Sequence, residues 1–233
     1  MAGREVKIMS TGGLKAAVRD LAGAFAEATG NRLLPVFASP AQVKSRIEGG
    51  EAVDVAVLSA PLIDDLVRQG KLAAGTRIDV ARSRMGLAVR AGAPKPDIST
   101  VEAFRRTLLS AKSLMYTDPK AGGASGVHFA KVIERLGIAD EVNAKAKLNS
   151  GGFNAEFVAR GEIELGIQQV SEIVPVKGAE LAGLFPEELQ QVTTFAAAVG
   201  ANAPEADAAA GLLRFLKSPA ALRVIEANGM EPG

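Results

Sequence analysis

Short apolar runs alternate with amphipathic helical patterns along most of the chain, and this alternation constrains the fold more than any other feature. Val6–Met9, Leu33–Phe37 and Val53–Leu58 are typical of buried strands, and each is followed by apolar residues at helical spacing. Strands that alternate with helices form mostly parallel sheets covered by helices. The sequence therefore predicts an α/β fold.

The junctions that follow these strands share one chemistry, in which small hydroxyl residues, Gly or Pro stand at a helix start. They occur at Thr11–Gly13, Ser39–Pro40, Ser59–Pro61, Gly122–Gly126 and Gly151–Asn154. The first N–H groups of a helix have no partner within it, and the positive end of the helix dipole attracts anions. Such junctions gather at the carboxyl edge of a sheet. We therefore expect an anion-binding edge.

The remaining elements are predicted from the same patterns. Further strands are expected at residues 86–90, 113–117, 163–168 and 192–199. Asp118–Gly126 is predicted to be a Gly-rich loop before a helix over Val127–Leu136, and Ser171 to cap a short turn. Two helices, Pro204–Lys217 and Pro219–Asn228, are expected to end the chain.

The composition excludes several classes of site. The chain has no Cys and one His, His128, so disulfides, Cys-ligated metals and multi-histidine metal sites are excluded. A net charge of +1 provides no global field for nucleic acid or an anionic membrane. Aromatic residues make up 4%, with one Tyr and no Trp, which argues against base-stacking platforms. Any anion must be held by local groups.

No catalytic or nucleotide motif is present. Lys120–Gly126 lacks the Gly-Lys-Ser/Thr ending of a P-loop and does not fit Gly-x-Gly-x-x-Gly, and no Gly-x-Ser-x-Gly elbow accompanies His128. Lys145 and Lys147 are predicted on a solvated face. No metal-binding spacing relates the carboxylates Asp64, Asp65, Glu156, Glu162 and Glu164. The sequence predicts a protein that binds without catalysis and needs no cofactor or metal.

A set of short motifs runs in order along nearly the whole chain. These are Val6–Leu14, Phe37–Ser39, Ile47–Gly50, Val53–Val55, Asp118-Pro119, Leu165–Ile167, Phe215–Ala221 and Gly229. In order and spacing they resemble the molybdate-type substrate-binding proteins of ABC transporters.

The resemblance implies the two-lobed periplasmic-binding-protein fold of the second type, with two hinge crossovers. Its lobes would span residues 1–84 plus 195–233 and residues 85–194, and the ligand would lie in the cleft between them. It further implies a periplasmic monomer that delivers a small anion to ABC permease subunits. The net charge and the lack of a membrane-length apolar run predict no nucleic-acid partner and no membrane insertion.

Three departures from the family pattern concern side chains that hold the oxyanion. Gly13 and Pro40 stand where the family places serines in the first and second loops, and Gln169 stands where it places a tyrosine. Each lost hydrogen bond costs about 0.5–1.5 kcal/mol, and more when the acceptor is charged. We therefore expect a small organic acid, a di- or tricarboxylate, as ligand. Molybdate or tungstate binding is the alternative.

Backbone N–H groups, hydroxyls and amides at the junctions are the predicted ligand contacts. The predicted ligand-binding residues are Thr11, Gly12, Gly13, Ser39, Ser59, Gly123, Ala124, Ser125, Gly126, Gly151, Gly152, Asn154 and Gln169. Lys120 and Arg84 are the nearest cations by sequence, and whether they or His128 reach the ligand stays open.

The location of the protein is also left open by the sequence. No window approaches the ~20 apolar residues of a membrane helix, and Met1–Lys7 turns directly into a strand without the apolar stretch of a secretion signal. A cytoplasmic ligand sensor on the same fold is therefore a second alternative to a periplasmic transport protein.

Overall fold

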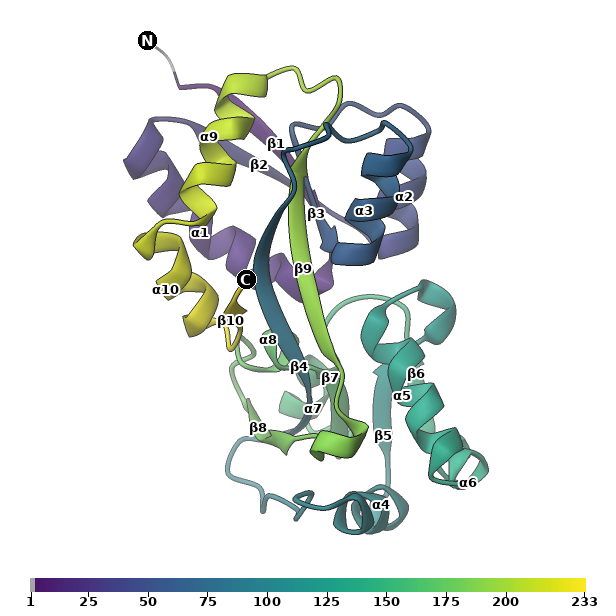
Figure 1. Cartoon of the computed structure of the whole chain (residues 1–233). Coiled ribbons are helices and arrows are strands. Elements are labelled where there is room, and N and C mark those ends of the chain that lie inside the picture. The colour runs from purple at the N-terminus through teal and green to yellow at the C-terminus, as the bar shows by residue number, and fades with distance from the viewer. Residues whose placement is uncertain (1–2) are drawn as a thin grey trace. The chain divides into compact units, whose positions relative to one another are not determined.

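The computed structural model describes residues 3–233, which divide into two compact units (Figure 1). Unit 1 runs to Arg82 and resumes over Thr193–Gly233, and unit 2 comprises Ser83–Val192. The chain passes between them within strand β4 (Ile78–Arg90) and at the start of β9 (Val192–Val199). The sequence places these boundaries after residues 84 and 194.

Unit 1 is built on a mostly parallel sheet. Strand β1 (Glu5–Ser10) pairs in parallel with β2 (Arg32–Phe37) on one side and β3 (Val55–Ser59) on the other. Strand β9 runs antiparallel to β3, and β10 (Glu231–Pro232) runs antiparallel to the first part of β4. The carboxyl ends of β1, β2 and β3 therefore lie at the same edge.

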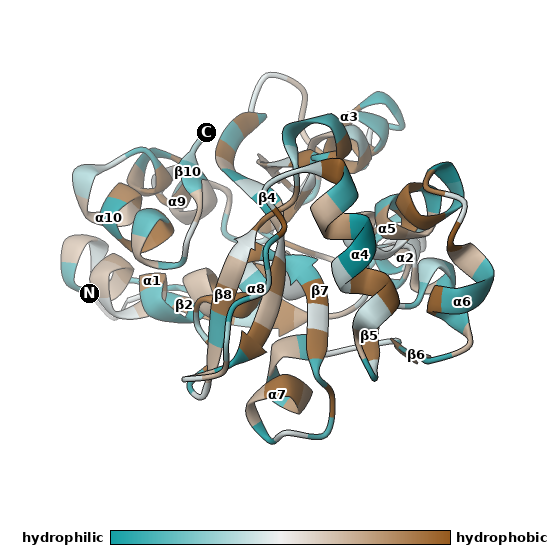
Figure 2. Cartoon of the chain, turned by 90° about the horizontal axis from the view of Figure 1, so that it is seen from below, coloured by the Kyte–Doolittle hydropathy of each residue, from teal (hydrophilic) through white to brown (hydrophobic). Residues whose placement is uncertain are grey.

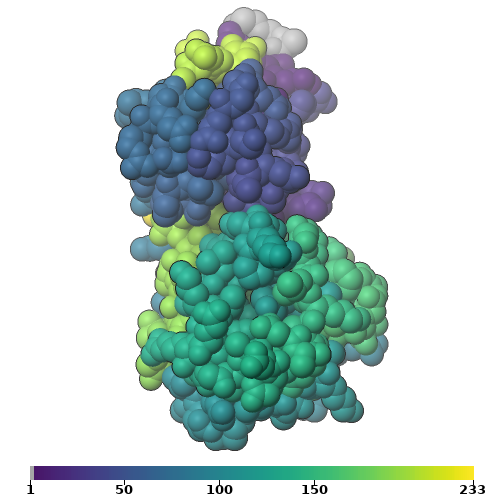
Figure 3. Space-filling view, turned by 90° about the vertical axis from the view of Figure 1, so that its right-hand side faces the viewer, coloured from purple at the N-terminus to yellow at the C-terminus, as the bar shows by residue number. Residues whose placement is uncertain are grey.

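Helices cover both faces of this sheet because its strands are apolar on both. The 3-10 turn η1 (Gly12–Leu14) leads into α1 (Lys15–Thr29), which packs with α9 (Ala206–Leu216) and α10 (Pro219–Ala227) on one face. Helices α2 (Pro40–Glu48) and α3 (Ala60–Arg68) cover the other. Figure 3 shows the yellow-green C-terminal residues beside the purple and blue N-terminal ones in this unit.

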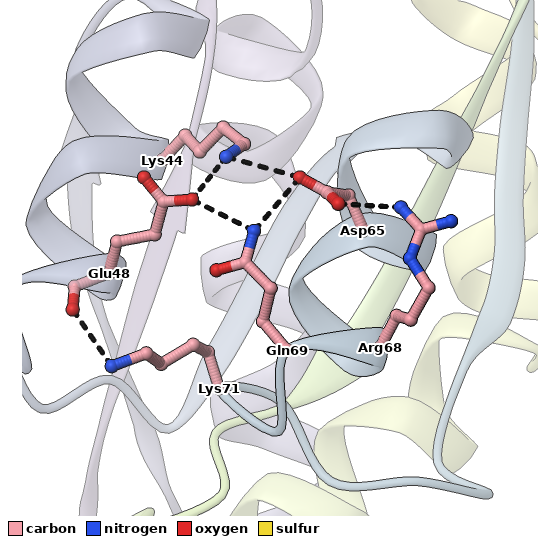
Figure 4. Close-up of polar contacts among 6 residues, drawn as sticks. All are labelled: Lys44, Glu48, Asp65, Arg68, Gln69 and Lys71. Atoms are coloured by element: carbon pink, nitrogen blue, oxygen red, sulfur yellow. Dashed lines mark hydrogen bonds and ion pairs between the residues drawn. The ribbon is translucent and has the colours of Figure 1, made fainter.

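A polar network joins α2 to α3 on the outer surface of unit 1 (Figure 4). The Lys44 ammonium lies 3.1 Å from Asp65 and also pairs with Glu48. Gln69 donates to Glu48 over 2.9 Å and to Asp65 over 3.0 Å. These side chains are partly open to solvent, and each pair therefore adds little to stability.

Unit 2 has a second mixed sheet. Strand β5 (Leu114–Thr117) pairs in parallel with β6 (Ala146–Asn149) and β7 (Leu165–Gln169). The later part of β4 runs antiparallel to β7 and to β8 (Ala179–Leu184). In Figure 2, β7 changes from brown to teal toward its end, where Gln168 and Gln169 follow the apolar residues.

The core of unit 2 is rich in aromatic rings. Phe129 contacts Tyr116 at a centroid distance of 4.9 Å and Phe185 at 6.2 Å, and Phe104 contacts Phe185 at 4.6 Å. The helical elements of this unit are α4 (Val101–Ser110), η2 (Pro119–Ala121), α5 (Ala124–Arg135), α6 (Ala139–Asn143), α7 (Asn154–Ala159), α8 (Val170–Ile173) and η3 (Glu187–Leu189).

The α/β fold predicted from the alternating pattern is confirmed, and several local predictions are corrected. Strand β4 is continuous over thirteen residues from Ile78, whereas only residues 86–90 were expected. Its pairing with β10 on one side of the unit boundary and with β7 and β8 on the other supports this length. The Gly-rich loop is shorter than expected, because α5 begins at Ala124.

Two further corrections concern polar side chains. The N-cap of α8 is Gln169, two residues before the predicted Ser171, because Gln169 and Glu172 form a capping box. Lys145 does not lie on a solvated face, since its half-buried ammonium donates to the carbonyl oxygens of Leu109 and Ala111 over 2.5 and 2.7 Å. Those carbonyls lie at the end of α4, where the helix leaves them without internal partners.

The described residues contain no helix long and apolar enough to cross a membrane. Within the same residues, no three His, Asp or Glu side chains are grouped as ligands for a metal ion.

Candidate functional site

The junctions of unit 1 meet at one edge because β1, β2 and β3 are parallel. The last residue of β1, Ser10, is level with Phe37 of β2 and with Val57 of β3. Thr11–Gly13 follow β1, Ser39 follows β2 and Ser59 ends β3. The predicted ligand-binding residues of unit 1 therefore come from adjacent strands.

The turn after β1 presents open donors. Gly12 and Gly13 begin η1, whose first N–H groups have no partner within the helix, and Thr11 makes no side-chain capping hydrogen bond. The Ser10 hydroxyl is fully buried and has no hydrogen-bond partner among the described residues. An unpaired buried hydroxyl is costly, so this turn is suited to a polar ligand.

The ring of Phe195 explains why residue 13 is a glycine. A Cβ at Gly13 would lie 2.6 Å from Cζ of Phe195, closer than real Cβ contacts come. Phe195 is 3% exposed and pairs with Ser59 across β3 and β9. The ring occupies the space that a first-loop serine side chain would enter, which leaves only the backbone of residue 13 as a donor.

The two serines of unit 1 differ in what their hydroxyls do. Ser39 accepts from the Gln42 N–H over 3.3 Å, and the Ser39 N–H donates to the Gln42 side chain over 3.1 Å. Ser59 stands at the N-cap of α3 but makes no side-chain capping hydrogen bond. Ser39 therefore stabilises α2, and the Ser59 hydroxyl is the better placed of the two for a ligand.

In unit 2, α5 begins against the end of β5. A Cβ at Gly126 would lie 2.1 Å from the Thr117 carbonyl oxygen, so only glycine allows this approach. Gly123 is the N-cap and offers no side chain to the first turn. The N–H groups of Ala124 and Ser125 lie in the first turn of α5, where the helix itself provides no acceptor for them. The Ser125 hydroxyl contacts Thr117 Oγ1 over 3.4 Å.

A buried amide network holds the next loop. Asn149 accepts from the Gly151 N–H over 3.1 Å and donates to the Asn154 side chain over 2.9 Å. The Asn154 N–H donates to Gln168 Oε1 over 2.5 Å, and Gln168 donates to the Gly152 carbonyl over 3.3 Å. The Gly151 N–H and the fully buried Asn154 side chain therefore hold the loop in place, and their contact with a ligand stays a prediction.

Gln169 and Glu172 form a second buried polar pair where β7 ends. Glu172 Oε2 accepts from the Gln169 N–H over 3.4 Å, as in a capping box. Burial raises the pKa of Glu172 to about 7, and the hydrogen bond from Gln169 opposes this shift. Glu172 was not among the predicted site residues, although a Glu three residues after a strand-ending Gln has the spacing of a capping box.

The candidate cations occupy different settings. Arg84 lies 3.5 Å from Glu187, and Lys120 is exposed within the η2 turn. His128 Nε2 lies 2.7 Å from the Leu189 carbonyl, so this histidine ties α5 to the segment around η3. Lys15 was not among the predicted ligand-binding residues, and it directly follows the Gly12–Leu14 turn.

A protein-family model of bacterial extracellular solute-binding proteins matches residues 6–231, which is nearly the whole chain. The chain belongs to this family. The molybdate-type resemblance predicted from the sequence is confirmed by a molybdate-binding protein of Azotobacter vinelandii, ModA, 26% identical over 97% of this chain and 89% of the relative. This solute-binding protein also has the fold of a solved Azotobacter vinelandii periplasmic molybdate-binding protein, with a TM-score of 0.83 and 20% identity over 98% and 99% of the two chains. The predicted fold class, the two-lobed fold of periplasmic binding proteins, is therefore confirmed.

A relative of higher identity carries the name of an enzyme. An aconitate isomerase from a Pseudomonas species is 35% identical to this solute-binding protein over 97% of the chain and 87% of the relative. The prediction of a protein without catalysis is therefore wrong. That prediction rested on the absence of known catalytic motifs from the sequence.

Proposed function

We propose that this solute-binding protein binds a small tricarboxylate of the aconitate type and interconverts its double-bond isomers. The observation that carries the proposal is the 35% identity to an aconitate isomerase over nearly the whole chain. The predicted preference for an organic acid over molybdate, made from Gly13, Pro40 and Gln169, supports the same ligand class.

The groups at the two sheet edges suit carboxylates. In unit 1, the donors are the N–H groups of Gly12 and Gly13 and the Ser59 hydroxyl, and in unit 2 they are the first N–H groups of α5. Carboxylates accept such hydrogen bonds readily at helix starts. Lys15 supplies positive charge beside the first of these edges.

The chemistry requires one proton to move. Aconitate carries a CH₂ arm and a double-bonded CH arm on one central carbon. Removal of a proton from the CH₂ carbon leaves an electron pair that is shared across the three carbons. Return of the proton to the other terminal carbon moves the double bond to the former CH₂ arm, in either geometry. Nothing is oxidised or reduced, and the step needs only a general acid–base.

A second candidate role is favoured by the family match itself. Solute-binding proteins of this family work with ABC permeases and are typically periplasmic. We propose that this chain, as a periplasmic monomer, delivers the same organic acid to a permease. If the protein binds the acid but does not deliver it to a permease, its role would be that of a ligand sensor or of an isomerase only.

The test combines binding with turnover. Thermal unfolding is measured with cis-aconitate, trans-aconitate, citrate, molybdate, tungstate and sulfate, and isomerisation of cis-aconitate is followed by proton NMR. Aconitate at a hundredfold excess over its Kd is expected to stabilise the protein by about 2.7 kcal/mol. Stabilisation by molybdate or tungstate alone would overturn the ligand class, and aconitate binding without isomer exchange would overturn the enzymatic half.

A matched pair of variants tests the charge beside the first loop. Lys15→Met is expected to weaken aconitate binding about tenfold, equivalent to about 1.4 kcal/mol. Lys112→Met removes the same charge from an exposed residue at the amino end of β5 and is expected to leave the Kd unchanged. Equal effects of the two variants would show that Lys15 acts only through the net charge.

A further inference from the structure

Glu172 is a buried carboxyl group at the carboxyl edge of the unit 2 sheet. It is 8% exposed and lies in α8, three residues after β7 ends at Gln169. Because β7 and β5 are parallel, this edge also carries the start of α5. Glu172 thus shares an edge with the predicted ligand-binding residues of unit 2.

One hydrogen bond reaches the Glu172 carboxyl, and a second holds the start of its helix. The Gln169 N–H donates to Glu172 Oε2 over 3.4 Å. The Ser171 N–H donates to Ser83 Oγ over 3.3 Å, which ties the start of α8 to β4 where the chain enters unit 2. A side chain held in this way is prepared for proton transfer without reorganisation.

No neighbouring charge accounts for the raised pKa of the Glu172 carboxyl group. Helix α8 packs against β7, β8 and α7, and Ser83 of β4 binds its start. Beside Ser83, Arg84 lies 3.5 Å from Glu187. Strand β7 has no ionisable residue, Glu180 of β8 pairs with Lys95 at 3.2 Å, and Glu156 of α7 is exposed. Burial is therefore what raises the pKa of Glu172 to about 7, which leaves both protonation states populated near neutral pH.

Two other ionisable groups near this edge are committed to structure. Asp118 Oδ1 accepts from the Lys120 N–H over 2.9 Å and caps the η2 turn. His128 is bound to the Leu189 carbonyl. Among these groups, Glu172 is the one with a single long hydrogen bond and an environment that favours proton exchange.

Resting on the proposed isomerase activity, we propose that Glu172 is the acid–base group that carries the proton between the two terminal carbons of the tricarboxylate. As a carboxylate it takes a proton from the CH₂ carbon. As a carboxylic acid it returns that proton to the other terminal carbon, and the double bond shifts between them. Glu172 ends each cycle in its starting state, so no co-reactant is consumed.

The decisive variant is Glu172→Gln, because its amide oxygen still accepts from the Gln169 N–H while the group no longer exchanges a proton. We expect kcat for aconitate isomerisation to fall about 10²–10⁴-fold, with the aconitate Kd changed less than threefold. In the wild-type protein, kcat/KM is expected to rise as the pH increases through about 7, because the carboxylate starts the reaction. A variant with kcat within threefold of wild type, or a wild-type profile without this rise, would overturn the assignment.

Glu180→Gln is the matched control, since it removes a half-exposed carboxylate on the neighbouring β8. Its kcat is expected to stay within twofold of wild type. Carbon-13 NMR of labelled glutamate in the wild-type protein gives a readout that does not depend on variant folding. Saturating aconitate is expected to raise the pKa of Glu172 further, and an unchanged titration would overturn contact with the ligand.

The two proposals fail in different ways. Absence of isomerisation in the wild-type protein would overturn the proposed function and the role of Glu172 with it. Isomerisation that survives in Glu172→Gln would overturn the role of Glu172 alone.

Discussion

Each unit contains a buried carboxyl group, and the two differ in the hydrogen bonds that they accept. Asp54 in unit 1 accepts from the Lys7 N–H and the Glu205 N–H, both over 2.8 Å, before β3 begins. Glu172 in unit 2 accepts from one N–H over 3.4 Å where β7 ends. The first carboxylate joins segments distant in sequence, whereas the second keeps its proton affinity high.

The carboxyl edges of the two sheets also differ in the polar groups that they carry. Unit 1 offers helix starts and the Ser59 hydroxyl. At Gly13 it offers only the backbone N–H, because the Phe195 ring leaves no room for a side chain. Unit 2 offers the start of α5, an amide network around Asn154 and the carboxyl of Glu172. In the proposed function, unit 1 would therefore supply donors for negative charge, and unit 2 would supply amides and the carboxyl group proposed to exchange a proton.

The largest stability effect is expected at the helix start of unit 2. Gly126→Ala would place a Cβ 2.1 Å from the Thr117 carbonyl, so the α5 start must move away from β5. We expect a loss of about 3 kcal/mol or more in the free energy of unfolding, measured by urea denaturation. Gly151→Ala is the control, because its Cβ meets nothing within 4 Å and is expected to cost about 0.5 kcal/mol or less. Equal losses would refute the close approach.

Glu172→Gln is expected to have the next largest effect, and its sign depends on pH. Burial raises the pKa of Glu172 from 4.5 to about 7, so its proton stabilises the native state below pH 4.5. That contribution is lost as the pH rises from 4.5 through 7. At about 1.4 kcal/mol per pKa unit, the variant should gain about 3 kcal/mol over wild type between pH 4 and pH 8. A stability difference between the variant and wild type that does not change with pH would contradict the raised pKa of Glu172.

A side chain added at Gly13 is expected to cost less stability than one at Gly126, because the Phe195 ring can move whereas the Thr117 backbone cannot move as easily. Gly13→Ser should lower the free energy of unfolding by about 2 kcal/mol, and adding Phe195→Leu should recover about 1 kcal/mol in a double-mutant cycle. Gly23→Ser, in α1 with nothing within 4 Å, serves as the control. Strict additivity of the two changes would show that the ring does not restrict residue 13.

The smallest effect is expected on the outer surface of unit 1. Hydrogen bonds from Lys44 and Gln69 lower the pKa of Glu48, and those from Arg68 and Lys44 lower the pKa of Asp65. This stabilisation is present above the unfolded pKa values and is lost as the pH falls through the lowered ones. Lys44→Met should therefore reduce the thermal midpoint only slightly at neutral pH and not at all in 1 M salt. A salt-independent loss would point to packing of the lysine stem instead.

The sequence predicted the fold through features that are local. Apolar runs with β-branched residues marked the strands, and caps such as Ser39 with Pro40 and Gly30 marked helix ends. The continuous β4 was not predicted, because its length depends on partners as distant as β10. Lys145 was placed wrongly for the same reason, since the carbonyls that bind it belong to α4 and the residue after it.

For the candidate site, the sequence by itself determined which strand-to-helix junctions carry glycine and hydroxyl residues, because a helix start and its donors are set by neighbouring residues. Only the tertiary structure decided which of these groups are already used, as with the Gly151 N–H and Asn154. It also decided that Phe195 fills the space beside Gly13 and that Glu172 is buried. Burial and close approach arise from segments far apart in the chain, and no local pattern encodes them.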